Sequence, residues 1–274
     1  MKRFFLLVAV FLFSTELYSN DVTPGFYFSQ SLGASLNSDG LQLKTNISYK
    51  YPLFNSESIL FKSTKIEPAI ENKLTPSYDN IAFKINIEPI AVFDITFKAA
   101  YKRYFTIIGY GFLYQDGYDT NKLRSTEGNV SLYNKSALFF NIIPTFKIKI
   151  NKIIAVSSLD FEYVNIFEDR YFLEETLFVN MYNRDWAMKN DTLLLYEFKK
   201  NFISGLYSEY IDVLNRQPGS GEIIHRINYI AVYSMEYTSY NLQFTGVLGH
   251  YLRSMHFNSW KTPYFAFVVS YSKK

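Results

Sequence analysis

Segments of about ten residues recur along this chain, each alternating apolar and polar side chains and each bounded by turn residues. The stretch Leu41–Tyr51 shows the pattern well, because Leu43 and Ile47 fall on one face whereas Lys44 and Lys50 fall on the other. Successive side chains of a strand point to opposite faces, so such a segment has one apolar and one polar surface. Many strands of this kind predict an all-β fold, specifically an antiparallel transmembrane β-barrel.

The pattern predicts about twelve strands, within a range of about ten to fourteen. They cover residues 26–36, 41–51, 58–70, 78–88, 90–104, 134–150, 153–167, 190–199, 202–214, 223–237, 240–253 and 263–272. Barrels of this class place short turns at one end and longer loops at the other. We expect the short connections at Pro52–Glu57, Pro89, Asn151–Lys152, Lys200–Asn201 and Thr238–Ser239.

The remaining connections are Asn37–Gly40, Glu71–Ser77, Phe105–Tyr133, Glu168–Lys189, Asn215–Glu222 and Ser254–Thr262. Two of them, 105–133 and 168–189, contain strand-like stretches of their own. These stretches either extend hairpins above the membrane or fold into the lumen as a plug, and the sequence leaves both readings open.

The first nineteen residues have the features of a secretory signal peptide. Met1-Lys2-Arg3 is basic, the apolar run Phe4–Phe13 follows, and a small residue lies near the expected cut at Ser19. The alternative is an uncleaved anchor, but the apolar run is too short to cross ~30 Å of hydrocarbon as a helix. We therefore expect residues 1–19 to be removed and residues 20–274 to form a single barrel domain.

Composition excludes several classes of function. The formal net charge is only +3, so the chain lacks the general positive field of a nucleic-acid-binding protein. The absence of cysteine excludes a disulfide framework, a thiolate metal site and the lipid-bearing cysteine of a lipoprotein. The 26 Phe and 24 Tyr residues suit strands and the aromatic girdles of a membrane barrel.

The C-terminal segment Tyr264–Tyr271 alternates apolar residues and ends on an aromatic one, although Ser272, Lys273 and Lys274 follow it. This segment resembles the last strand of bacterial outer-membrane β-barrel proteins, and the mature chain as a whole resembles that class. The resemblance implies a location in the bacterial outer membrane, contact with outer-membrane lipid, and recognition by the barrel-insertion machinery. It names an architecture rather than a family with a known reaction, and it gives neither a cofactor nor an oligomeric state.

Charged residues of the predicted strands fall on the polar faces. Because a cationic side chain facing lipid at the bilayer midplane costs about 2–4 kcal/mol, these residues are expected to point inward. The lumen-lining candidates are Lys44, Lys50, Lys84, Glu88, Asp94, Lys98, Lys102, Lys147, Lys149, Asp160 and Glu162. They predict either a pore that mildly favours anions or an internal network of salt bridges in a narrow or plugged barrel.

Catalytic signals are weak. His250 has Ser254 nearby, and His256 has Ser254 and Ser259 nearby, which resembles the His–Ser pair of outer-membrane phospholipases and deacylases. A group that orients the histidine does not accompany them, and no carboxylate and histidine cluster has metal-ligand spacing. The sequence thus favours a passive, porin-like channel for small polar solutes and no enzyme. The alternatives are a non-conducting structural or surface-interaction barrel and, less favoured, an outer-membrane lipid hydrolase.

Overall fold

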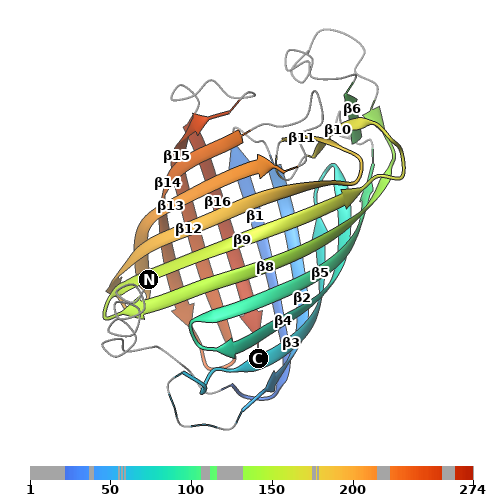
Figure 1. The fold of residues 1–274 in the computed structure, drawn as a ribbon. Helices are drawn as coiled ribbons and strands as arrows, with labels where there is room; N and C mark the ends of the chain where they lie inside the picture. Colours follow the sequence, from blue (N-terminus) through green and yellow to red (C-terminus); the bar gives the residue numbers. More distant parts are fainter. Residues whose placement is uncertain are drawn as a thin grey trace, which may run out of the picture.

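Twelve strands close into one barrel in the computed structural model of this chain (Figure 1). The structure describes residues 22–36, 40–54, 56, 58, 60–105, 112–115, 132–174, 177, 179–214, 223–254 and 263–273. The barrel strands are β1 (Gly25–Leu36), β2 (Gly40–Pro52), β3 (Lys65–Leu74), β4 (Tyr78–Ile90), β5 (Phe93–Tyr104), β8 (Ser136–Ile150), β9 (Ile153–Asn165), β12 (Asp185–Lys199), β13 (Phe202–Val213), β14 (Ile223–Glu236), β15 (Tyr240–Arg253) and β16 (Pro263–Lys273).

Each barrel strand pairs antiparallel with its neighbours, and the first strand pairs with the last. Ser31 of β1 lies opposite Ser270 of β16, and this β1–β16 ladder completes the circle. A closed barrel has no edge, so neighbouring strands satisfy the backbone hydrogen-bonding groups of every strand. The predicted fold class, an all-β antiparallel barrel of about twelve strands, is confirmed.

The two ends of the barrel differ in their connections. The short turns 91–92, 151–152, 200–201 and 237–239 share one end with the connection 53–64, and we call this the turn end. Residues 105–135, 166–184, 214–222 and 254–262 connect strands at the opposite end, here the loop end, drawn uppermost in Figure 1. In the turn 151–152, Asn151 takes a left-handed conformation with φ 52°, which asparagine tolerates better than most residues.

The third strand and the connections beside it differ from the prediction. The strand predicted at 58–70 is β3, Lys65–Leu74, so the connection predicted at Pro52–Glu57 is longer and the one predicted at Glu71–Ser77 is shorter. Residues 60–63 form turns instead, in which Phe61 and Lys62 donate backbone hydrogen bonds to the carbonyl of Ser58. The true strand keeps strict alternation, with Ile66, Ile70 and Leu74 on one face and charged residues on the other. The prediction placed the strand too early because an apolar run precedes it in the sequence.

A small second sheet lies at the loop end. It contains β6 (Phe112–Gln115), β7 (Leu132–Tyr133), β10 (Tyr171–Glu174) and β11 (Val179–Tyr182) in the order β11-β10-β6-β7. These strands fall in the two predicted strand-like connections, and β12 begins at Asp185 rather than at residue 190. The hairpin β10–β11 directly precedes β12 in the chain and packs against the barrel.

The outer wall of the barrel is apolar. Exposed large apolar side chains recur around it, among them Ile47, Phe97 and Phe267. Exposed apolar surface of this extent does not suit water but suits the hydrocarbon of a membrane. Aromatic pairs follow the turn end of this wall, including Phe26–Tyr49 and Phe93–Phe146, with ring centroids 5.0 and 4.9 Å apart. They lie where the barrel passes from lipid to water.

Among the described residues there is no helix long and apolar enough to span a bilayer. The predicted signal peptide, residues 1–19, lies outside the described residues, as do His256 and Ser259.

Candidate functional site: the charged inner wall

Alternation along the twelve strands places most of their charged side chains on the inner face of the barrel. The cations on this face are Lys44, Lys50, Lys65, Lys73, Lys84, Lys98, Lys102, Lys147, Lys149, Lys189 and Arg226. The carboxylates are Glu67, Glu71, Glu88, Asp94, Asp160, Glu162, Asp185, Asp191, Glu197, Glu209 and Glu236. Positive and negative groups are therefore nearly equal in number in the described barrel, but they are distributed unevenly.

The largest local excess of positive charge surrounds Glu71 of β3. Its carboxylate is 2.8 Å from Lys84, 3.0 Å from Lys44, and 3.8 Å from both Lys73 and Lys98. The four lysines come from β2, β3, β4 and β5, whereas the Glu71 side chain is only 4% exposed. We call these five residues the Glu71 cluster. It holds four cations for one carboxylate.

A pair of carboxylates follows on β9. Asn141 of β8 donates hydrogen bonds to Asp160 at 2.8 Å and to Glu162 at 3.0 Å. Among the described residues, neither carboxylate has a lysine or arginine within 4.0 Å, and one Glu162 oxygen is buried without a hydrogen-bond partner. Asn141 pairs with Lys98 on one side and with Glu162 on the other, so β8 separates the acidic pair from the Glu71 cluster.

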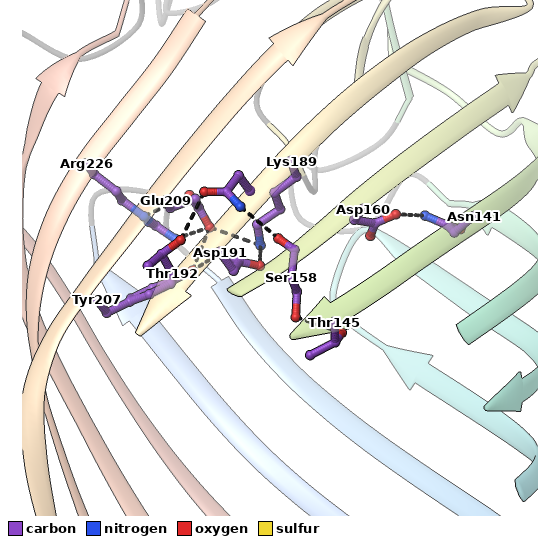
Figure 2. A network of polar contacts seen from close by, with 11 residues as sticks. Asn141, Thr145, Ser158, Asp160, Lys189, Asp191, Thr192, Tyr207, Glu209 and Arg226 are labelled. Atoms are coloured by element: carbon purple, nitrogen blue, oxygen red, sulfur yellow. Dashed lines mark hydrogen bonds and ion pairs between the residues drawn. The ribbon is translucent and has the colours of Figure 1, made fainter. Parts of the chain in front are cut away.

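A second cluster lies on β12, β13 and β14 (Figure 2). Glu209 contacts Arg226 at 2.8 Å and Lys189 at 3.0 Å, and Lys189 also contacts Asp191 at 3.1 Å. The Tyr207 hydroxyl donates to Asp191 at 2.7 Å and lies 2.9 Å from Glu209. We call these five residues the Glu209 cluster. Its two cations face two carboxylates, so its charges balance.

The lysines nearer the turn end also have partners on the inner face. Lys147 lies 2.9 Å from Glu88 and 3.1 Å from Asp94. Lys149 forms an ion pair with Glu197, across the intervening strand β9. The Lys50 ammonium lies 3.9 Å from the centre of the Tyr27 ring, a distance typical of a cation–π contact.

Apolar side chains fill the inner face toward the loop end. Buried residues of β4, β5, β8, β9 and β12–β16 join one hydrophobic cluster with Phe172, Leu177, Val179 and Met181 of the β10–β11 hairpin. Within this layer Lys102 of β5 and Glu174 of β10 form an ion pair of 2.6 Å, with side chains 1% and 0% exposed. The hairpin is thus tied to the inner face of the barrel wall at the loop end. Lys102 lies in this dry layer.

A cavity of about 670 Å³ opens at the turn end. Its lining includes Ser29 of β1, Asn46, Ser48 and Lys50 of β2, and Glu67 of β3. The inner face therefore has three levels from the turn end to the loop end: a cavity with polar lining, a belt of charged clusters, and an apolar layer.

The structure brings the predicted lumen residues together with others that the sequence reading missed. All of the predicted candidates lie on the inner face, but Glu71, Lys73, Lys189, Glu209 and Arg226 were not among them. Glu71 and Lys73 were missed because the third strand was predicted at 58–70. The alternation of Lys65–Leu74 contained the signal that would have identified them.

Outward-facing polar groups include one serine–histidine contact. Ser208 of β13 and His225 of β14 are 3.3 Å apart, and this is the only hydrogen bond that His225 makes with the described residues. A catalytic pair requires a further group that orients the histidine, and none contacts His225 in the described part of the chain. His250 is exposed on β15, away from Ser208 in the strand order, and its predicted partner Ser254 follows that strand. The described residues contain no group of three or more His, Cys, Asp or Glu side chains that could hold a metal ion.

The chain thus forms a β-barrel with the architecture of bacterial outer-membrane proteins: apolar outside, charged inside and closed by a β1–β16 ladder. No family model and no curated protein sequence matches it. Among solved structures, the KdgM porin is similar at 8% identity and a TM-score of 0.45, over 90% of this chain and 98% of that one. The NanC porin is similar at 7% identity and a TM-score of 0.45, over 90% and 99%. OmpT, an outer membrane protein of Vibrio cholerae, is similar at 7% identity and a TM-score of 0.40, over 94% and 99%.

Proposed function

We propose that this protein is an outer-membrane channel for small polar solutes, in which the β10–β11 hairpin restricts passage at the loop end. The observation that carries the proposal is the polar inner face, on which a 670 Å³ cavity at the turn end leads to the belt of charged clusters. Charged side chains that line a narrow passage favour solutes with complementary groups and exclude apolar ones. A solute that crosses the barrel must also pass the apolar layer around Phe172 and Met181.

A second candidate is a barrel that does not conduct and that works through its loop-end surface. The apolar layer and the buried Lys102–Glu174 pair favour this alternative, because both hold the hairpin inside the barrel. In this case the connections 105–133 and 168–189 carry the function, and the inner charges are structural pairs.

Conductance in planar bilayers separates these two candidates. We expect the wild type to conduct weakly. Glu174→Arg should conduct better, because a second cation beside the buried Lys102 repels it and drives the hairpin out of the barrel. Glu168→Arg is the matched control: it reverses the carboxylate of the Lys135–Glu168 ion pair in the loop-end connection 166–184, where the Glu168 side chain is 39% exposed, and it should behave as the wild type. If none of the three proteins conducts, the result favours the non-conducting barrel.

Membrane location and export belong to the same proposal. We infer that residues 1–19 direct export, that lipid contacts the apolar outer wall, and that the insertion machinery acts on the C-terminal strand β16. A closed barrel resists detergent until heated, so the protein should show heat-modifiable migration on gels and should fractionate with the outer membrane. Recovery of the folded protein in the soluble periplasmic fraction would contradict the membrane assignment.

Lipid hydrolysis is the least supported function. The Ser208–His225 contact is the observation that bears on it. We expect the refolded protein not to hydrolyse a fluorescent phospholipid. Hydrolysis that His225→Ala or His256→Ala abolishes would establish the enzyme instead.

A further inference from the structure

The Glu71 cluster has more hydrogen-bond donors than the protein can satisfy. An ammonium group offers three N–H donors and a carboxylate accepts about four hydrogen bonds, so four lysines present about twelve donors to one carboxylate. Among the described residues, Lys44, Lys73, Lys84 and Lys98 contact no carboxylate other than Glu71. Lys98 is 11% exposed and both Lys73 and Lys84 are 21% exposed, so bulk water has limited access to them. Largely buried ammonium groups that share one carboxylate are stabilised when a further anion binds beside them.

The acidic pair on β9 does not supply this anion. Asp160 and Glu162 are held by Asn141 and have no lysine within 4.0 Å among the described residues. At longer range they offset part of the positive field. They do not accept hydrogen bonds from the cluster, so the lysine donors remain available to a solute.

The turn-end cavity ends next to the cluster, although no residue of the cluster lines it. Asn46, which lines the cavity, is the β2 partner of Glu71 in the strand register. Lys44, the next inward residue along β2, is the most exposed member of the cluster at 40%. The side chain of Asn46 makes no hydrogen bond with the described residues, and its Oδ1 is buried, so the Nδ2 group is the part of its amide that can donate to a solute.

We propose that the Glu71 cluster is a binding site for a small oxyanion with two or more negative charges, of which inorganic phosphate is the simplest. The inference rests on the proposed function in that the ligand is one of the solutes that enter the barrel. The oxygens of a tetrahedral dianion accept hydrogen bonds from several ammonium groups at once, whereas chloride offers a single charge. Glu71 keeps the lysine side chains gathered around one point, so their charges act on the ligand together.

Isothermal titration of inorganic phosphate into the refolded protein in detergent tests the site, with sodium chloride at equal ionic strength as reference. We expect saturable binding to the wild type that chloride does not reproduce. Lys84→Gln combined with Lys98→Gln should weaken it at least about tenfold, because charge-assisted hydrogen bonds to the anion are lost. This variant keeps Lys44 and Lys73 beside Glu71, so the carboxylate retains cationic partners.

Lys147→Gln is the matched control, because it removes an inner-face cation that already contacts two carboxylates. Its affinity for phosphate should equal that of the wild type. Absence of binding, or equal weakening in both variants, would overturn the proposal. If the double variant does not fold, Lys44→Gln serves in its place, and unchanged affinity in that variant would also overturn it. Binding without conductance would refute the channel and keep the site, whereas conductance without binding would refute the site alone.

Discussion

The Glu71 and Glu209 clusters use the same kinds of side chain on the same inner wall, but in different ratios. Glu71 is shared by four lysines. Among the cations of the described residues, Glu209 contacts only Lys189 and Arg226, and Asp191 provides a second carboxylate for Lys189. The Arg226 guanidinium also lies 3.9 Å from the centre of the Tyr264 ring.

The ratio of positive to negative groups distinguishes charges that stabilise the barrel from charges that can bind a solute. In a balanced cluster the opposite charges neutralise one another, and each residue loses a partner when another is removed. In an unbalanced cluster, stability depends on the residue whose charge is outnumbered. The residues of the more numerous charge remain available to bind a ligand. Both kinds occur on the inner wall that the described strands form.

The largest effect should come from Glu71→Gln, which leaves four lysines without a carboxylate. Removing one side of a buried ion pair costs about 3–5 kcal/mol, and we expect about 3 kcal/mol here because the lysines are partly exposed. Urea-induced unfolding of the refolded barrel in lipid vesicles measures it. Glu209→Gln should cost less, since Lys189 keeps Asp191 and Arg226 keeps Tyr264. Equal losses in the two variants would remove the distinction between the clusters.

Charge reversal in the unbalanced cluster should change ion selectivity. If the barrel conducts, Lys84→Glu combined with Lys98→Glu should move the reversal potential under a salt gradient toward cation selectivity. Lys189→Gln in the balanced cluster is the comparison and should move it less, because neighbouring groups there already compensate one another. An open channel whose reversal potential is unchanged by the double reversal would show that the Glu71 cluster does not line the conducting path.

Accessibility to water should differ between the two faces of β2. Cysteine at Lys44 should react with a membrane-impermeant thiol reagent, because this side chain is 40% exposed inside the barrel. Cysteine at Leu43 should react far less, because it faces lipid. A shift of the strand register by one residue would exchange the two results, so equal labelling would refute the placement of Lys44 in the cluster.

The smallest effect should come from Asp191→Asn. Asp191 is 31% exposed, and Lys189 retains its contact with Glu209, so the loss should lie within about 1 kcal/mol. The same urea-unfolding measurement applies. A loss as large as that of Glu71→Gln would mean that the Glu209 cluster depends on every one of its members.

Much of the barrel could be predicted from the chain itself. The faces of β2, β4 and β5 follow from alternation, and Lys44, Lys84 and Lys98 fall on the inner face as expected. The third strand was predicted at the wrong residues because an apolar run at 59–61 precedes it. The prediction therefore did not include Glu71, the central residue of the cluster. An excess of lysine was expected over the whole lumen, whereas the structure concentrates it around one carboxylate.

Alternation in the sequence is enough to assign the inward-facing side chains, because the period of a strand is two and lipid excludes charge from the other face. Which of these charges contact one another depends on the packing of the strands. Lys102 and Glu174 are 72 residues apart in the chain, and Lys149 reaches Glu197 past an intervening strand. Such contacts depend on barrel closure, strand register and the inward fold of the β10–β11 hairpin, and no local pattern of residues encodes these distances. The same inward set of charges is compatible with an evenly basic pore or with separate clusters, and the packing of distant strands selects the clusters.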